Sequence, residues 1–504
     1  MEIFGNKISS RVYLNALKTQ KKYIRKFGDD RSIKYPLGLE QNNVITPAFD
    51  CRTIVIKDGA AGTTTPAGTP TFTDALPEKP VIIGNIRMGF GHYRISMAMA
   101  SAAHAMGYTP LWMDLNSFPQ TTCTKIISSQ NDLYSMGSRL SQKSRLFNKL
   151  LWEPLNYEGF KKLSYNAKDQ VTAQLMTSVF GEIPKDIPFI ATHVWPSQAA
   201  VHAGMKQVVN AIPDNWPMAL HLSEGAVHTV QTWNTYWGYR TLNGFEGNKI
   251  LNPMQNKDII FTGHYIDHEL ASNVHTDCIN RIKRAKNGKP IRFLFTIGGA
   301  GAQGEFFASI IKTLLPYVKQ NKACIYINCG DYENVWTGLK QTLPELTAAD
   351  GAFAPVLHFD NWEEEKSFAQ SAIDNEDEKS GQGIHVFFNK DIFAAVYITN
   401  LMMRASDILV TKPSELAFYP VPKLFIRRIG GHEKWGAIHS AELGDGTQEC
   451  ETPQSACAAV EQILQNPLLI EQMCCNIINE QKKGTYDGAY RAIEIATGNY
   501  NKDL

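Results

Sequence analysis

The chain has 504 residues, 50 basic and 49 acidic, with a formal net charge of +1. This length exceeds a single ordinary hydrophobic core, so we expect two domains with additional segments. The balanced charge argues against a general nucleic-acid-binding protein, so nucleic acid is not an expected partner.

The cysteines and apolar segments bear on the compartment. The nine cysteines are scattered without a CxxC pair, which argues against a zinc site and fits reduced thiols. The first residues do not resemble an apolar secretion signal. The longest apolar stretch, 391–403, is interrupted by Asn400 and is shorter than the ~18 residues that span a bilayer. We therefore expect a cytoplasmic protein.

The first 80 residues differ in composition from the rest. Residues 1–35 contain nine Lys or Arg against three acidic residues, a net charge of +6. This charge suits an anionic membrane surface, and it equally suits a solvated, weakly ordered arm. Residues 57–80 are rich in Gly, Thr and Pro, which is typical of a linker. We predict a basic arm and linker over 1–80, with the first α/β domain starting near Val81.

From Val81 onward, short apolar runs alternate with helical patterns, which predicts a parallel, doubly wound sheet. We expect this N-terminal Rossmann-like domain to span residues 81–265. Its strands are predicted at 81–85, 110–115, 187–193, 207–213, 218–222 and 258–262, and its helices at 92–106 and 196–206.

A glycine-rich turn, Gly89-Phe90-Gly91-His92, follows the first of these strands. Glycine permits close approach of the backbone, and a helix N-terminus presents free N–H groups to an anion. Gly89 and Gly91 are therefore candidates for an acceptor or phosphate loop. His92 is a candidate general base, because histidine titrates near neutral pH. A helix-capping or packing histidine is the alternative.

Two polar residues follow later strands of this half. Carboxyl ends of parallel strands line the crevice of an open α/β sheet. His193 ends strand 187–193, and Asp214 follows strand 207–213. We take Asp214 as the second candidate base, ahead of Glu224 and His228.

An amphipathic stretch runs from 126 to 155, and within 134–157 Leu, Phe and Trp alternate with Arg and Lys. A basic amphipathic helix with this composition can lie in a membrane interface. Leu150, Leu151 and Trp152 are the candidate membrane residues. An ordinary helix that covers the sheet with its basic face in solvent is an equal alternative.

The strand–helix pattern restarts after 263–267, which we interpret as a hinge. A second Rossmann-like domain is expected over 266–485, and a tail, 486–504, is expected to pack back across the first domain. Strands are predicted at 292–297, 324–329, 384–388, 408–412 and 423–429, and helices at 305–319, 332–343, 391–405, 453–465 and 467–482.

An acidic insertion, 361–383, interrupts this second half. Its first twenty residues, 361–380, hold seven acidic residues and two lysines, a net charge of −5. Charge runs of this kind are typical of a solvated, mobile loop, and we assign it no chemistry.

The second half contributes its own candidate site residues. Gly298, Gly299 and Gly301 follow strand 292–297, where backbone N–H groups can contact a diphosphate without a metal ion. Simple tight-turn geometry is the alternative. Glu415, after strand 408–412, can accept hydrogen bonds from both hydroxyls of a ribose, or it can be a first-turn acid favoured by the helix dipole. Ser414 fits the N-cap position in both cases.

Three segments together resemble GT-B glycosyltransferases. More narrowly, they are similar to the branch with the bacterial peptidoglycan GlcNAc-transferase and the mono- and di-glycosyldiacylglycerol synthases. The segments are Gly89-Phe90-Gly91-His92; Ile297-Gly298-Gly299-Ala300-Gly301; and Ala405 to Glu415 with Val421-Pro422 and Gly430-Gly431-His432-Glu433. One departure is that several residues of the family's second glycine-rich loop are missing between Lys412 and Glu415.

The resemblance implies an α/β fold with two Rossmann-like domains facing a cleft. It implies a nucleotide-sugar donor, most simply a UDP-sugar, and metal-independent, inverting transfer to an acceptor hydroxyl. His92 then has an acceptor-side or catalytic role, and Glu415 binds the uridine ribose. The remaining donor-side residues by resemblance are Lys412, Ser414, His432 and Glu433.

No cofactor or metal site is expected, because the nucleotide sugar is a substrate. A membrane lipid is one acceptor that the resemblance implies, at the inner face of the membrane, with a glycolipid as product. Two other functions stay open. A nucleotide-sugar epimerase of GT-B fold needs acid and base groups without an acceptor site. A non-catalytic GT-B binding protein is favoured by the shortened loop before Glu415.

Overall fold

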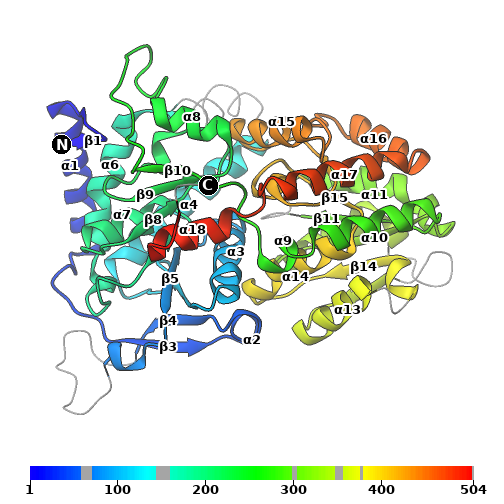
Figure 1. Ribbon diagram of the computed structural model, residues 1–504, viewed down its shortest axis with the longest axis horizontal. Helices are drawn as coiled ribbons and strands as arrows, with labels where there is room; N and C mark the ends of the chain where they lie inside the picture. The colour runs from blue at the N-terminus through cyan, green and yellow to red at the C-terminus, as the bar shows by residue number, and fades with distance from the viewer. Residues whose placement is uncertain (58–70, 144–158, 298–302, 347–355, 375–377, 502–504) are drawn as a thin grey trace.

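The computed structural model describes residues 1–57, 71–143, 159–297, 303–346, 356–374 and 378–501. Two sheets lie side by side in Figure 1, one of eight strands and one of six, with helices on both faces. Almost all neighbouring strands are parallel. The predicted fold class, two Rossmann-like α/β domains, is confirmed by this topology.

The eight-stranded sheet has the order β10-β9-β8-β7-β5-β6-β4-β3. Only β3 and β4 pair antiparallel in it, and the other pairs are parallel. Its strands are β3 (Leu37–Gln41), β4 (Arg52–Ile56), β5 (Pro80–Asn85), β6 (Thr109–Asp114), β7 (Phe189–Ala191), β8 (Val208–Ala211), β9 (Val227–Val230) and β10 (Ile259–Phe261). Its helices include α3 (Gly91–Ala105), α4 (Thr122–Lys143), α6 (Leu163–Ala173), α7 (Val194–His202) and α8 (Trp233–Thr241).

The prediction that 1–80 is an arm and linker is wrong for much of that segment. Strands β3 and β4 extend the first sheet beyond β6, so this sheet begins well before Val81. Helix α1 (Ser10–Phe27) packs against α6, and its buried Gln20 donates to the Val171 carbonyl at 2.6 Å. The basic side chains lie on the outer face of α1, so the charge count concealed an amphipathic helix.

The predicted strand at 218–222 is also wrong. This segment contains a short 3-10 helix, η6 (Ala219–His221). The buried amide of Asn166 donates to the carbonyls of Ala219 and Leu222, both at 2.7 Å. These carbonyls are satisfied by a side chain rather than by a neighbouring strand, which allows a non-sheet conformation at a buried place.

The six-stranded sheet has the order β13-β14-β12-β11-β15-β16, and every pair in it is parallel. Its strands are β11 (Ile291–Thr296), β12 (Ala323–Asn328), β13 (Val356–Phe359), β14 (Gly383–Phe387), β15 (Ile408–Thr411) and β16 (Lys423–Phe425). Its helices include α10 (Val274–Lys286), α11 (Gly304–Lys319), α12 (Glu333–Thr342), α14 (Ile392–Ala405), α15 (Lys434–Leu443), α16 (Pro453–Gln465) and α17 (Leu468–Lys482).

The acidic insertion contains a packed helix, α13 (Trp362–Asp374), which corrects the prediction of a mobile loop. Asn361 accepts from the Glu363 N–H at 3.0 Å and so caps its first turn. Ala369 and Ala372 are buried, and α13 packs against α14. Even Glu365 is buried, where it accepts from the amide of Asn389 at 3.3 Å.

The chain returns to the first sheet at its end. Helix α18 (Gly488–Thr497) lies beside α3 in Figure 1 and also contacts β7 and β8. Buried side chains of α3, α14 and α18 form one hydrophobic cluster, so the two halves share part of their core. This shared core places α3 at the boundary between the halves.

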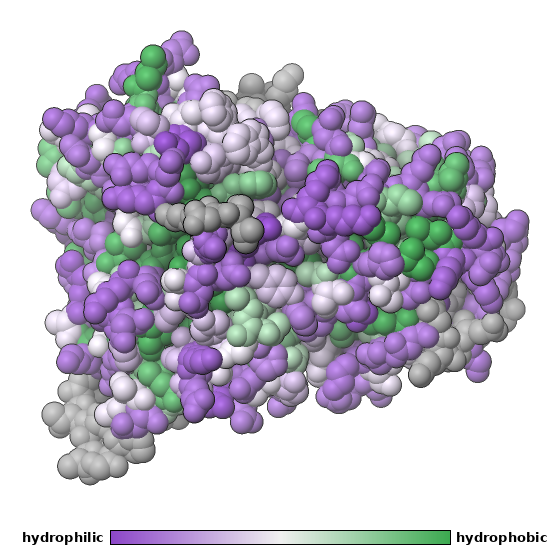
Figure 2. Space-filling model, viewed as in Figure 1, coloured by the Kyte–Doolittle hydropathy of each residue, from purple (hydrophilic) through white to green (hydrophobic). Residues whose placement is uncertain are grey.

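Polar side chains cover most of the face shown in Figure 2, with smaller apolar areas between them. Within the part of the chain that the structure describes, no helix has the length and hydropathy needed to span a membrane.

Candidate functional site

Each sheet has one place where the strand order reverses. In the first sheet, β5 pairs with β6 on one side and with β7 on the other. In the second sheet, β11 pairs with β12 on one side and with β15 on the other. Connections leave such a switch point in opposite directions, which opens a crevice at the carboxyl ends of the strands.

The crevice of the first sheet opens into a cleft between the two halves. Residues from both halves line this cleft, which we call the interdomain cleft: Met88, Gly89, Phe90, Gly91, His92, Phe160, His193, Pro213, Asp214, Met218, Leu220, His221, Lys412, Ser414, Glu415, Ile429, Gly430, His432 and Glu433. The structure thus brings together the described candidate site residues of both halves, except the two lesser base candidates Glu224 and His228, which do not line this cleft.

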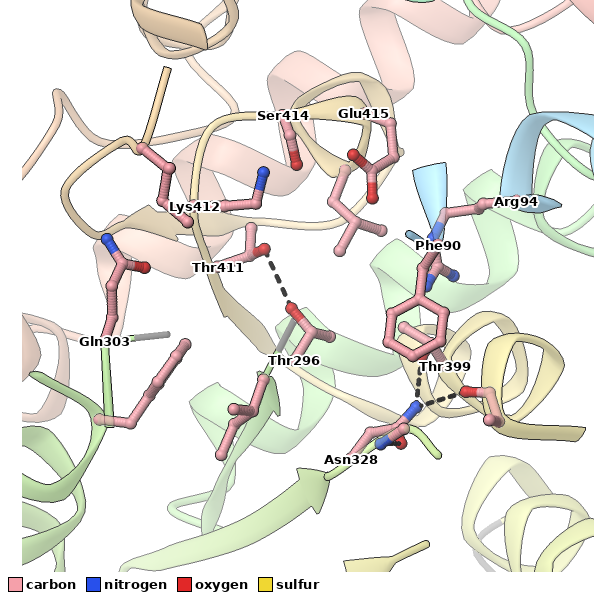
Figure 3. Close-up of a pocket in the computed structure, with 16 residues that line it drawn as sticks. Phe90, Arg94, Thr296, Gln303, Asn328, Thr399, Thr411, Lys412, Ser414 and Glu415 are labelled. Carbon is pink, nitrogen blue, oxygen red and sulfur yellow. Dashed lines mark hydrogen bonds between the residues drawn. The ribbon is translucent and has the colours of Figure 1, made fainter. Parts of the chain in front are cut away.

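A smaller pocket, the switch-point pocket, lies at the carboxyl ends of β11 and β15 (Figure 3). It shares Phe90, Lys412, Ser414, Glu415 and Ile429 with the interdomain cleft. At its base, the Thr296 hydroxyl donates to the Thr411 hydroxyl at 2.9 Å. The Asn328 amide donates to the Thr399 hydroxyl at 2.6 Å and to the Ala395 carbonyl at 2.9 Å. These polar groups are already partnered and fix the shape of the pocket.

His92 is the second residue of α3, which begins one residue before the predicted helix start. Its Nδ1 lies 2.7 Å from the Thr192 carbonyl, which follows β7. A carbonyl can only accept, so Nδ1 carries the hydrogen and Nε2 is left as the acceptor. Burial lowers the pKa of His92, and this outweighs the opposing effects of the Thr192 carbonyl and of Asp214. The result is a neutral imidazole with an acceptor nitrogen, which is the form that a general base requires.

His193 serves a different purpose from His92. Its Nδ1 accepts from the Trp195 N–H at 3.1 Å and so caps α7. Its ring packs edge-on against the ring of His92, with centroids 4.7 Å apart. His193 therefore supports the position of His92 in the cleft.

Asp214 lies between two histidines. Its Oδ2 is 3.0 Å from Nε2 of His221, and its Oδ1 is 3.9 Å from Nε2 of His432 in the other half. Burial raises the pKa of Asp214, but the combined effect of His432 and His221 is larger and holds that pKa below its usual range. A carboxylate of low pKa is a weak base and a good orienting group. The geometry therefore favours Asp214 as the partner that orients His221, rather than as the base.

Sequence reasoning missed His221. It lies in η6, where a strand was predicted, and its Nδ1 is buried in the cleft without a hydrogen-bond partner among the described residues. The arrangement of Asp214 and His221 is that of a carboxylate–imidazole dyad. The sequence carried no signal for it, because the predicted strand 218–222 included His221.

The Asp214 carboxylate yields a stability prediction. Because its folded pKa is lowered, ionised Asp214 stabilises the fold above its unfolded pKa of about 3.9, and this contribution is lost as the pH falls further. We expect Asp214→Asn to destabilise the protein by about 1.5–3 kcal/mol at pH 7, the range for hydrogen bonds to charged groups. The difference in melting temperature between parent and variant should hold from pH 7 to pH 5 and narrow below pH 4. A difference that is unchanged in acid would contradict this assignment.

Glu433 holds the loop before α15. Its carboxylate pairs with the Lys412 ammonium and accepts from the Ile429 N–H at 2.7 Å and the Gly430 N–H at 3.2 Å. Burial raises the pKa of Glu433, but Lys412 and His432 outweigh it and keep that pKa lowered. Glu433 is thus an ionised structural group, and its predicted contact with a donor sugar stays a prediction.

Glu415 faces the start of α3 across the boundary between the halves. It begins the short 3-10 helix η10 (Glu415–Phe418). A Cβ built on Gly91 would lie 3.1 Å from Glu415 Oε2, so glycine at 91 lets the carboxylate approach the α3 N-terminus. Ser414 occupies the N-cap position of η10, as predicted, but its side chain makes no capping hydrogen bond.

Several predicted site residues lie outside the described residues. These are Gly298, Gly299 and Gly301 of the second glycine-rich turn, and Leu150, Leu151 and Trp152 of the amphipathic segment. Gly89 is described and has a φ of +88°, a conformation that favours glycine.

Three contacts hold the halves together around the cleft. Arg87 pairs with Asp331. The ring of Phe90 presses on Gly330, where an added Cβ would lie 2.6 Å from the ring. Trp216 stacks on Trp435 with centroids 5.0 Å apart and planes 12° apart. The two halves are therefore in direct contact around the cleft.

Comparison with known proteins matches each half separately. Residues 2–241 match a family model described as "Domain of unknown function (DUF6937)", and residues 254–497 match one described as "Domain of unknown function (DUF6938)". No curated protein matches the chain in sequence.

Solved structures of similar fold include UDP-GlcNAc 2-epimerase from Neisseria meningitidis bound to UDP-GlcNAc, at 13% identity, with 82% of this chain and 98% of that chain covered and a TM-score of 0.44. An α,α-trehalose 6-phosphate synthase from Burkholderia multivorans matches at 11% identity over 83% and 98% of the chains, with a TM-score of 0.42. A glycosyltransferase from Rickettsia africae ESF-5 matches at 10% identity over 84% and 100%, with a TM-score of 0.37. Both epimerases and glycosyltransferases thus occur among these matches, and the branch named by the motif resemblance stays a prediction.

Proposed function

We propose that this chain is a glycosyltransferase that moves a sugar from a nucleotide sugar, most simply a UDP-sugar, to an acceptor hydroxyl. One observation carries the proposal: the crevices of two Rossmann-like sheets meet at one cleft, with His92 on one wall and Glu415 on the other. An acceptor-side base and a ribose-binding carboxylate are what such a transfer requires on opposite walls.

In the proposed reaction, Nε2 of His92 takes the proton of the acceptor hydroxyl. The acceptor oxygen forms a bond to the anomeric carbon of the donor as the bond from that carbon to the diphosphate oxygen breaks. The nucleoside diphosphate leaves, and the configuration inverts. We propose that no metal ion takes part, so turnover should persist in excess EDTA.

The donor is tested by thermal unfolding in the presence of UDP, GDP, ADP and uridine. A ligand that binds only the folded protein raises stability by about 2.7 kcal/mol at one hundred times its Kd. We expect UDP to stabilise the chain most. If none of the nucleotides raises the unfolding temperature, the proposed nucleotide donor is refuted, and a non-catalytic function explains the fold better.

Nucleotide-sugar epimerisation is the second candidate, and one feature of the cleft favours it. Removal and return of a proton on two sides of a sugar ring requires acid and base groups on two walls. His92 and the Asp214–His221 dyad lie on one side of the cleft, and Glu415 lies on the other. Incubation with UDP-GlcNAc in D₂O, without an acceptor, distinguishes the two functions. Deuterium in the sugar ring supports epimerisation, and release of UDP only with an acceptor supports transfer.

A membrane lipid is the acceptor that we propose to test first. Helix α1 contains six basic residues and no acidic one, and α4 exposes Leu133, Met136 and Leu140 at helical spacing before the candidate membrane residues begin. Each basic residue contributes about 1 kcal/mol at an anionic surface, and this attraction is screened by salt, whereas burial of apolar groups is not.

We therefore expect the protein to float with anionic vesicles at low salt and partly at high salt. Replacing Leu150, Leu151 and Trp152 with Ser should remove the salt-resistant part. Ile250→Ser, which changes a fully exposed apolar residue elsewhere, is the matched control. If the parent protein does not float with anionic vesicles even at low salt, the proposal of a lipid acceptor is refuted and a soluble acceptor is the alternative.

A further inference from the structure

We propose that Arg94 is an anion-binding residue of the switch-point pocket and contacts the diphosphate of the donor. The inference rests on the proposed function for the identity of the ligand, and on the pocket itself for the presence of an anion site. It assigns a phosphate contact to the N-terminal half, although every donor-side residue named so far belongs to the C-terminal half.

Arg94 reaches the pocket from α3. It lies one turn after Gly91, and Figure 3 shows it beside Phe90, on the side of the pocket opposite Gln303. Only 3% of the residue is exposed, although it lines the pocket. An arginine is rarely buried this deeply unless a partner satisfies its charge.

The partners of Arg94 within the protein are neutral. Its Nη1 donates to the amide oxygen of Asn400 at 2.5 Å and to the Val396 carbonyl at 3.4 Å. Its Nε is buried without a hydrogen-bond partner. Among the residues that the structure describes, no carboxylate forms an ion pair with Arg94. A buried guanidinium with an unused donor and no anionic partner is incomplete without an anion.

The amide of Asn400 separates Arg94 from the nearest buried carboxylate of the hinge. Asn400 Nδ2 donates to Asp267 Oδ1 at 2.8 Å, and the Tyr419 hydroxyl donates to Asp267 Oδ2 at 3.0 Å. Burial and the neighbouring Glu269 raise the pKa of Asp267 to about 7, despite Arg94. Both oxygens of Asp267 thus already accept hydrogen bonds from other donors, and among the described residues Asp267 forms no ion pair with Arg94.

The other charged groups that line the pocket do not fill this role. Glu415 and Lys412 both line it, and their charges are opposite. Lys412 is paired with Glu433. The pocket thus offers a ribose-binding carboxylate at its rim and a positive group at its α3 side. This distribution of charge fits a nucleoside diphosphate better than a nucleoside.

The position of Arg94 on α3 also relates it to His92. The two residues lie on the first turns of one helix, so closure of the halves brings the acceptor-side base and the phosphate contact into place together. A guanidinium at the diphosphate would stabilise the charge that develops there as the glycosidic bond breaks. We therefore expect Arg94 to affect both diphosphate affinity and turnover, whereas Glu415 affects recognition of the ribose.

The test compares the affinities of UDP and uridine by calorimetry, in the full-length parent and in Arg94→Gln. We expect the variant to bind UDP about 10- to 100-fold more weakly and to bind uridine unchanged, because only the diphosphate contact is lost. Arg94→Lys should keep part of the preference for UDP. Arg87→Gln is the matched control, because Arg87 also crosses between the halves but pairs with Asp331 and does not line the pocket.

Inorganic pyrophosphate separates this inference from the proposed function. Binding of pyrophosphate by the parent but not by Arg94→Gln would support the anion site, even if neither uridine nor UDP binds. In that case only the proposal of a nucleotide donor would be refuted. If the affinities for UDP and for uridine fall by the same factor in Arg94→Gln, the proposed contact of Arg94 with the diphosphate is refuted, whereas the proposed nucleotide donor is not. If Arg94→Gln does not fold, two other measurements test the anion site: pyrophosphate binding by the parent, and the ratio of UDP affinity to uridine affinity in Arg94→Lys. A parent that binds neither pyrophosphate nor UDP overturns both proposals.

Discussion

His92→Ala is expected to lower turnover by about 10²- to 10⁴-fold, the usual contribution of general acid–base catalysis. The reason is that the Thr192 carbonyl fixes the hydrogen on Nδ1 and leaves Nε2 as the proton acceptor, while burial keeps the ring neutral. The affinity for UDP should remain nearly unchanged, because His92 lies on the wall opposite Glu415. Initial rates at saturating donor and UDP calorimetry measure the two quantities.

The control for this variant is a histidine of the same half that is exposed at the surface. His202, in α7, contacts the Gln170 carbonyl at 2.8 Å and does not line the cleft. His202→Ala should therefore change stability without a comparable loss of turnover. If His92→Ala retains near-parent turnover, the Asp214–His221 dyad becomes the better base.

The second half of the fold was predictable where strands are buried on both faces. Strands such as β11 and β12 read as continuous apolar runs, because a parallel sheet covered by helices is apolar on both sides. The predicted ranges 292–297 and 324–329 differ from β11 and β12 by a single residue at each end. For these segments the local apolar pattern and the buried environment in the folded protein both favour a strand.

Elements at the edges were missed for a physical reason. Strand β13 is the edge of the second sheet and is partly exposed, so its composition carries no strong apolar run. Helix α1 has six basic residues, but one of its faces is packed against the protein. Helix α13 likewise has one packed face, although its sequence is rich in acidic residues. In each case net charge was read as disorder, whereas the arrangement of charge on one face decided the structure.

The candidate site was predictable as far as it follows from topology. Asp214 was chosen because it follows a strand end, and His92 and Glu415 were chosen from turns between a strand and a helix together with the GT-B resemblance. The structure places all three at one cleft. His221 and Arg94 were not predictable in the same way. His221 depends on the 3-10 helix that replaces a predicted strand, and Arg94 lies within the predicted helix 92–106 without a motif that marks it. Its burial depends on α14, about 300 residues further along the chain, which supplies Asn400.

Glu415→Ala is expected to weaken UDP binding by about 1.5–3 kcal/mol, the range for hydrogen bonds to a charged group. Glu415 lines both pockets, at the end of the loop that follows β15, and no hydrogen bond from a described residue occupies its carboxylate. The ribose hydroxyls can therefore bind it without displacing a protein partner. The loss should appear equally for UDP and for uridine, because both carry the ribose.

The matched control is Glu433→Gln, which changes a carboxylate of the same cleft that is already bonded to Lys412 and to two backbone N–H groups. We expect that variant to lose stability, because it leaves the partly buried Lys412 without its carboxylate partner. A 2′,3′-dideoxyuridine diphosphate gives a second comparison. It should bind the parent about as weakly as UDP binds Glu415→Ala, and it should bind the variant no more weakly than UDP does. Equal UDP affinity in the parent and in Glu415→Ala would refute the ribose assignment and make Glu415 only the carboxylate that faces the N-terminus of α3.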